Sequence, residues 1–246
     1  MGSYFVQMIE ISRSGLISHM EDLDNVSHNL SNINTNGFKQ IRTNFQEMLD
    51  RQLMNGVYPT SSQRWNQQGV FETTTSPLDL AVSGEGYFGI RLPDGRTAYT
   101  RDGHFSLDAN NRIVAANGYP LVWTGGQIPA EAEEIAVSQD GVVRYRVGQT
   151  WTQAGTISLY RTPNLSGMIS YGQNLWLESE ASGAVQTGTP GTNNFGQIIN
   201  GTLEKSNVDV AAETTHMVVL QRAFDMSMRM LKQTDNMIGE AIQMRQ

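Results

Sequence analysis

The chain has 246 residues, a formal net charge of −7 and 39% hydrophobic residues, so it is long enough and apolar enough to bury a core. An acidic chain repels phosphate groups, which argues against a nucleic-acid partner. The absence of cysteine excludes disulfides, thiolate metal sites and a cysteine nucleophile. No run of about 18 apolar residues could span a membrane, and the first ten residues lack the features of a secretory signal. Export from the cytoplasm would therefore need another route.

A seven-residue apolar repeat marks the N-terminal region and predicts a helix over about residues 4–33. The repeat consists of Ile9, Leu16, Leu23 and Leu30, with Phe5, Met20, Val26 and Ile33 beside it. We expect this helix to end near Asn36 and Gly37, because both residue types tolerate a left-handed backbone. Further apolar residues predict a second, shorter helix: Ile41, Phe45, Met48, Leu49 and Leu53.

Short β-type runs separated by turn signals occupy residues 71–203. Examples are residues 78–82, 87–92, 113–114 and 156–160. Pairs such as Asn117 with Gly118 and Asp140 with Gly141 fall between such runs and are typical of tight turns. The pattern indicates antiparallel hairpins, with a surface loop at residues 187–194.

A further long helix is predicted at the C-terminal end. Residues 206–209 (SNVD) fit a helix start in which Ser206 caps the first turn and an acid follows three residues later. The helix repeats apolar residues at intervals of seven, at Met217, Phe224, Leu231 and Ile238, with Leu220, Met228 and Ile242 alongside. Either helix alone is compatible with packing on a globular core, but two such stripes flanking a β region favour pairing of the ends.

The predicted architecture is therefore α+β, with the N- and C-terminal helices paired as a coiled coil and a central antiparallel β domain. We expect an N-terminal helix at residues 1–36 and a connecting segment with a short helix at 37–70. The β domain is expected at 71–204 and the C-terminal helix at 205–246.

No catalytic, cofactor or metal site is predicted. Residues 84–89 (GEGYFG) match a dinucleotide-binding glycine pattern, but a strand rather than a helix is expected to follow, so no helix start would hold a phosphate. Residues 108–112 lack the glycine and the closing acid of a calcium loop. The four histidines have no metal-ligand spacing. Asp79, Asp94, Asp102 and Asp108 could pair as acid and base in three dimensions, although turn geometry already explains an Asp before Gly.

Three blocks of sequence resemble the axial proteins of the bacterial flagellum, and most closely its rod proteins. Residues 29–39 (NLSNINTNGFK) resemble the N-terminal rod signature, with His28 in place of a common Asn and Ser31 in place of Ala. Residues 76–88 and 98–105 resemble the first β-domain block, and residues 201–210 with 221–224 resemble the C-terminal block. Residues 98–105 and 172–191 are more similar to the distal rod type. The shortened stretch between Leu53 and Gln68 and residues 224–228 are more similar to the proximal type. The distal type is favoured.

The resemblance implies a structural subunit that polymerises helically into the rod, most closely the distal rod, and is exported through the flagellum's own channel into the periplasm. Implied partners are further copies of the chain, other rod proteins, the hook and the export apparatus, with no nucleic acid, small-molecule substrate or cofactor. Because the terminal helices would bury their stripes only with neighbours, their apolar residues are the expected assembly site. The expected self-assembly residues are Ile9, Leu16, Leu23, Leu30, Asn29, Asn32, Gly37, Phe38, Asn207, Val208, Met217, Phe224, Leu231 and Ile238. A proximal rod or hook-type subunit, a secreted β-rich binding module and an acid–base enzyme are the alternatives.

Overall fold

The computed structural model describes residues 2–48 and 56–243, which form two compact units. The helical unit comprises the described residues of Met1–Ile33, Gln40–Trp65 and Val208–Gln246. The β unit comprises Asn34–Lys39 and Asn66–Asn207. The chain therefore enters and leaves the β unit from the helical unit, and the segment 37–70 that was expected to connect them is divided between the two.

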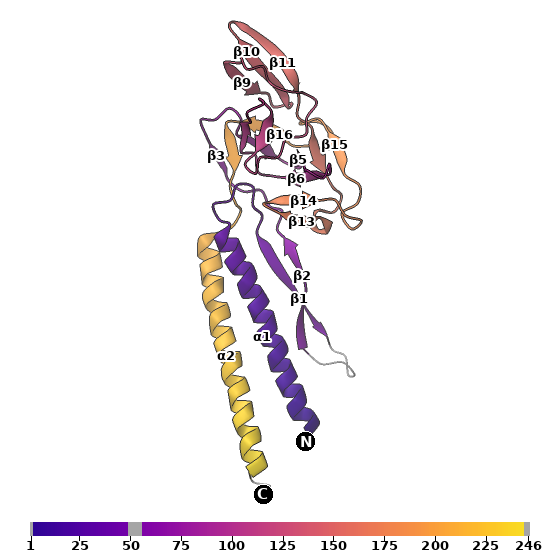
Figure 1. Cartoon of the computed structure of the whole chain (residues 1–246). Helices are drawn as coiled ribbons and strands as arrows, with labels where there is room; N and C mark the ends of the chain where they lie inside the picture. Colours follow the sequence, from indigo (N-terminus) through magenta and orange to yellow (C-terminus); the bar gives the residue numbers. More distant parts are fainter. Residues whose placement is uncertain (1, 49–55, 244–246) are drawn as a thin grey trace. The chain divides into compact units, whose positions relative to one another are not determined.

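Helices α1 (Gly2–Ser31) and α2 (Val210–Gln243) lie side by side and run in opposite directions within the helical unit (Figure 1). Both helices are predicted from the sequence. The coiled-coil geometry of their pairing stays a prediction. The first turn of α2 is capped by Asp209, whose carboxylate accepts hydrogen bonds from the Ala211 and Ala212 N–H groups at 2.9 and 3.2 Å. The prediction of Ser206 as the cap is therefore wrong, because Asp209 is an equally good capping residue and lies immediately before Val210.

The short helix predicted in residues 37–70 is wrong. Strands β1 (Ile41–Met48) and β2 (Gly56–Arg64) form an antiparallel hairpin beside α1 (Figure 1), while Leu49 and Leu53 lie outside the described residues. The register shifts between Asn44 and Phe45, where Phe45 pairs with Pro59. A bulge accommodates proline in a strand, whereas a helix interior does not. The spacing of the apolar residues in this segment matched a helix, but tertiary pairing decided the structure.

The β unit is built from antiparallel pairs, as predicted. A four-stranded sheet has the order β13-β14-β6-β5, a three-stranded sheet has the order β11-β10-β9, and the remaining pairs are β12-β15, β16-β4, β17-β3 and β7-β8. The strands are β3 (Phe71–Thr73), β4 (Leu80–Ser83), β5 (Phe88–Arg91), β6 (Thr97–Thr100), β7 (Phe105–Leu107), β8 (Ile113–Ala115), β9 (Glu134–Val137), β10 (Val142–Val147), β11 (Thr150–Thr156), β12 (Leu159–Arg161), β13 (Ile169–Gly172), β14 (Leu175–Leu177), β15 (Gln186–Gly188), β16 (Gln197–Asn200) and β17 (Thr202–Glu204).

The larger of two apolar clusters in the β unit contains Phe88 and Phe105, which meet edge to face with ring centroids 5.2 Å apart. The glycine-rich segment at residues 84–89 runs directly into β5, so the expectation that no helix follows it is confirmed. The loop predicted at residues 187–194 begins later than expected, because Thr187 and Gly188 belong to β15.

Candidate self-assembly site

The face that α2 turns towards α1 repeats at alternating intervals of four and three residues. Met217, Phe224 and Leu231 are half-buried on it, as predicted, and Leu220 is buried. The other buried or half-buried members are Glu213, Ser227 and Thr234. Met228, predicted to lie alongside the stripe, is 48% exposed, and Ser227 and Thr234 occupy the neighbouring positions. The side chains of Ile238 and Ile242 lie outside the described residues.

The leucine stripe of α1 is also only partly covered. Leu16, Leu23 and Leu30 are half-buried, while Val26 beside them is 2% exposed. Met20, predicted to lie beside the stripe, is instead exposed, and the side chains of Phe5 and Ile9 lie outside the described residues. Two helices that cover each other's stripes only partly leave apolar surface available to a further partner.

The Asn29 side chain of α1 forms hydrogen bonds with the start of β1. It donates to the Ile41 carbonyl and accepts from the Ile41 N–H, both at 2.8 Å. It also donates to the Glu213 carboxylate of α2 at 3.4 Å, and the Gln40 amide donates to the same carboxylate. Asn29 is 2% exposed and Glu213 is 4% exposed. These buried contacts hold α1, β1 and α2 together through satisfied polar groups.

Asn32 has a different position. Its side chain donates to the His28 carbonyl at 2.8 Å, one turn earlier, and that carbonyl also accepts the Asn32 backbone N–H at 3.2 Å. Near the Asn29 contacts, a cavity of about 480 Å³ is lined by α1, β1 and α2, and His216 approaches Asp22 there at 3.4 Å. Asn29 and Asn32 were both expected to act in self-assembly, but the structure shows a buried Asn29 that bonds to β1 and α2 and an Asn32 that bonds to the end of α1.

Gly37 anchors the N-terminal signature in the β unit. Its φ is +66°, and its N–H donates to the Glu204 carbonyl at 2.7 Å. A Cβ atom at this position would lie 2.5 Å from the carbonyl carbon of Arg101. Only glycine can adopt the left-handed backbone conformation and lie this close to the Arg101 backbone without displacing its neighbours. The first helix was expected to end near Asn36 and Gly37, but α1 already ends at Ser31, and Gly37 lies in the turn that follows it.

A buried cluster of charges lies beside this turn. Lys39 and Glu204 form an ion pair whose side chains are 5% and 0% exposed, and Arg101 approaches the same carboxylate at 3.4 Å. Gly69 donates its N–H to Glu204 at 3.0 Å, and Lys39 donates to the Gln67 carbonyl at 2.9 Å. Burial lowers the pKa of Lys39, and the Glu204 charge opposes that effect. Neither composition nor residue spacing predicts this cluster.

The three motif blocks therefore meet within the β unit: Lys39 comes from the first, Arg101 from the second and Glu204 from the third. Asn207 reinforces the contact, since its N–H donates to the Phe38 carbonyl at 3.4 Å and its side chain donates to the Gln67 carbonyl at 2.8 Å. Phe38 is buried. Val208, which begins the last segment of the helical unit, is also buried.

The acidic residues weighed as acid–base candidates have structural contacts. Asp79 pairs with His104 at 2.8 Å and accepts from the Thr74 hydroxyl at 2.6 Å. Asp94 and Asp108 accept backbone N–H groups in their turns at 2.9 and 2.8 Å, which lowers the pKa of each carboxyl. Burial raises the pKa of Asp102. Among the described residues, no three His, Asp or Glu side chains are grouped to hold a metal, and neither described helix has a stretch suited to crossing a lipid bilayer.

Comparison with known proteins matches this arrangement. The model of the flagellar hook protein FlgE/F/G D1 domain matches residues 81–145, and that of the flagellar basal body rod FlgEFG protein C-terminal region matches residues 199–244. The chain is 36% identical to the flagellar basal-body rod protein FlgG of Caulobacter vibrioides, over 98% of this chain and 100% of that protein. The chain belongs to the flagellar basal-body rod family. Its FlgG relative in Buchnera aphidicola (subspecies Acyrthosiphon pisum) is 35% identical over 95% of this chain and 98% of that protein.

Within the rod family, the FlgG type is favoured. The FlgF protein of Rhizobium meliloti is 29% identical over 90% of each chain, below both FlgG relatives. The C-terminal family model covers β17, residues 205–209 and all of α2, so it includes Glu204 and the partly covered stripe. The family consists of structural flagellar proteins. The contacts of the acidic residues described above agree with a structural role.

Proposed function

We propose that this chain is a structural subunit of the flagellar basal-body rod, of the distal type, that polymerises helically with copies of itself. The observation that carries the proposal is the similarity to FlgG proteins across nearly the whole chain. The half-buried stripes of α1 and α2 support it, because a polymer would cover surface that one subunit leaves open. The other rod proteins, the hook and the flagellar export apparatus are the proposed partners, and the periplasm is the proposed location.

Within this proposal, Leu16, Leu23, Leu30, Met217, Phe224 and Leu231 act in assembly by forming the helix pair that neighbouring subunits contact. Asn29, Gly37 and Phe38 act indirectly, because their contacts fix the fold of each unit. Asn32 contributes at the end of α1 and Asn207 beside Phe38, while Val208 is proposed because it is buried. Ile9 and Ile238 are proposed on the sequence repeat alone.

The test is deletion of the gene, followed by motility assays and mass spectrometry of basal bodies purified from the parent strain. We expect deletion to abolish motility and the chain to be present in the parent's basal bodies. Electron cryomicroscopy of basal bodies tagged at the exposed Asn193 would then locate the subunit along the rod. A motile deletion strain that releases the chain as a folded monomer would instead support the secreted binding module.

A further inference from the structure

Helix α2 carries a second apolar stripe that α1 does not cover. Val219, Met226, Met230 and Met237 are 57%, 65%, 60% and 54% exposed. They follow one another at intervals of seven, four and seven residues. At about 100° per residue, this outer stripe lies about 110° around α2 from the face that packs on α1. Long apolar side chains with this spacing form a helix-packing surface, and here it is open to solvent.

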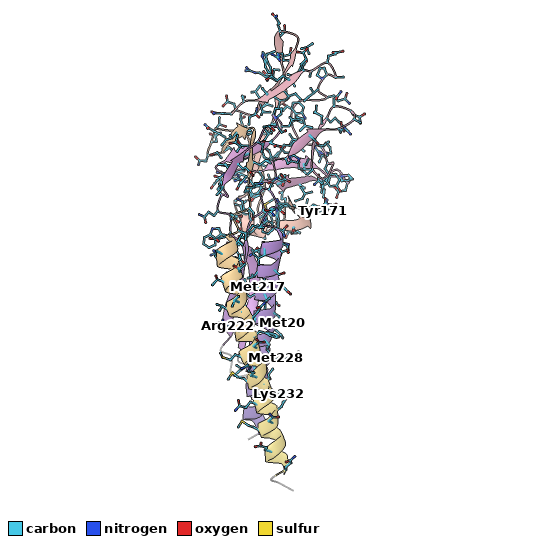
Figure 2. All side chains as sticks on the ribbon, turned by 90° about the vertical axis from the view of Figure 1, so that its left-hand side faces the viewer. Met20, Tyr171, Met217, Arg222, Met228 and Lys232 are labelled. Atoms are coloured by element: carbon cyan, nitrogen blue, oxygen red, sulfur yellow. The ribbon has the colours of Figure 1, made fainter. Side chains whose placement is uncertain are left out.

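The outer stripe has a basic border. Arg222 and Arg229 are exposed and lie next to it on the side away from α1. Neither forms a hydrogen bond or ion pair with another residue in the described part of the chain. Figure 2 shows Arg222 along α2 together with Met228 and Lys232, which belong to other faces of the helix. A partner for the outer stripe should therefore offer apolar groups flanked by acidic ones.

Helix α1 presents such a surface. Ile17 and Met20 are 43% and 54% exposed, and the exposed carboxylates of Glu21 and Asp24 lie beside them. This acidic face is about 110° around α1 from the leucine stripe. It is also distinct from the side on which Asn25 and Asn29 bond to β1. Within residues 2–48 and 56–243, neither Glu21 nor Asp24 has an ion-pair partner.

We propose that the outer stripe of α2 packs on the acidic face of α1 in a second copy of the chain, an inference that rests on the proposed function as a rod subunit. Contact between two α2 stripes would place Arg222 and Arg229 against the same arginines, whereas contact with α1 places them near Glu21 and Asp24. Because α1 and α2 run in opposite directions, the outer stripe and the acidic face point to opposite sides of the pair. Their contact therefore joins different molecules and can repeat without closing.

Cross-linking of the full chain in assembled basal bodies tests this contact. Because the chain has no cysteine, introduced thiols are unique. We would combine Ile17→Cys with Met226→Cys or with Met230→Cys, and treat basal bodies with a flexible bis-maleimide. The matched control combines Ile17→Cys with Met228→Cys, since Met228 is also exposed but lies about 180° from the outer stripe.

We expect cross-linked dimers and longer ladders from the two test pairs and only monomers from the control. Dimers from Met226→Cys alone would indicate contact between two α2 helices and would overturn the inference, as would dimers from the control or none from the test pairs. These outcomes require the variants to be present in basal bodies. If the unmodified chain is absent from basal bodies, it is the proposed function that fails.

A charge exchange supplies a second, independent readout. The double variant Arg222→Glu/Arg229→Glu should lose assembly and motility, and addition of Glu21→Arg and Asp24→Arg should restore both. Circular dichroism of each purified variant controls for folding. Loss of assembly without restoration by the exchanged pair, in a variant with unchanged helix content, would overturn the pairing of these faces.

Discussion

Lys39 and Glu204 form a buried ion pair although 165 residues separate them in the sequence. The pair closes the β unit, because Lys39 precedes its first long segment and Glu204 ends its last strand, β17. Arg101 contributes a second positive charge to the same carboxylate. A single buried carboxylate thus connects the three sequence motifs that mark the family.

Removing one member of this pair should destabilise the β unit strongly. Lys39→Met leaves the Glu204 carboxylate without its nearest cation, and loss of one partner of a buried pair typically costs about 3–5 kcal/mol. The measurement is the free energy of unfolding in urea, monitored by tryptophan fluorescence. Lys205→Met is the matched control, because the Lys205–Glu72 pair is largely exposed and should contribute about 0–1 kcal/mol. Equal losses in the two variants would contradict the importance of burial.

Gly37→Ala should destabilise the β unit more than Gly118→Ala does. Both glycines have a positive φ, of 66° and 80°, so both substitutions carry the strain of a left-handed residue, about 1–2 kcal/mol. Only the Cβ at residue 37 would collide with the backbone of Arg101, since nothing lies within 4 Å of the corresponding position at Gly118. Thermal melting of the two variants side by side measures the difference. Similar melting temperatures would show that the close approach has no energetic consequence.

Asp102→Asn should stabilise the protein at neutral pH and have little effect in acid. Burial raises the pKa of Asp102 above its ordinary 3.8 in the folded state, so as pH rises through 3.8 the unfolded chain loses this proton first. Between pH 3.8 and the raised pKa, the free energy of unfolding therefore falls as pH rises. The asparagine variant cannot titrate and does not show this decrease. Urea unfolding of both proteins across this range measures the difference. A difference independent of pH would exclude titration of Asp102 as its cause.

Leu220→Ala should weaken the helix pair selectively. Leu220 is 6% exposed, and truncation of a buried leucine costs about 2–5 kcal/mol. Met228→Ala, at an exposed site about two turns away on the same helix, should change stability by only about 0.5 kcal/mol. Hydrogen exchange resolved by peptide would detect faster exchange in α1 and α2 and unchanged exchange in the β unit. Faster exchange throughout the chain would show that the two units do not unfold separately.

The elements that sequence reasoning found correctly are those with a strong local period or a strong turn signal. The two helices follow from their heptads, and the hairpins of the β unit follow from paired turn residues such as Asn117 and Gly118. The β1–β2 hairpin was missed because Ile41, Phe45 and Met48 are spaced as on a helix, and its strands depend on each other and on Asn29. Local periodicity contains no information about such partners.

In the candidate site too, features set by local sequence pattern were predictable and features set by distant partners were not. The half-buried positions Met217, Phe224 and Leu231 were predictable from the repeat, but the exposure of Met228 was not. Burial on a paired helix depends on where its partner lies, and a stripe of residues can be shifted by one position without loss of period. The cluster of Lys39, Arg101 and Glu204 joins residues far apart in the sequence, and only the folded chain brings them together.

The hydrogen bond between the Asn207 N–H and the Phe38 carbonyl has a consequence for the order of folding. Residue 38 lies in the first segment of the β unit, Asn34–Lys39, and residue 207 ends its second segment, Asn66–Asn207. Before that unit forms, pairing α1 with α2 would require closing a flexible loop of residues 32–209, at a cost in entropy. Once it has formed, the two chain ends emerge together and the remaining search is short. The contacts between α1 and α2 join residues that are far apart in the sequence. We therefore expect the helix pair to form last, at a rate set by folding of the β unit.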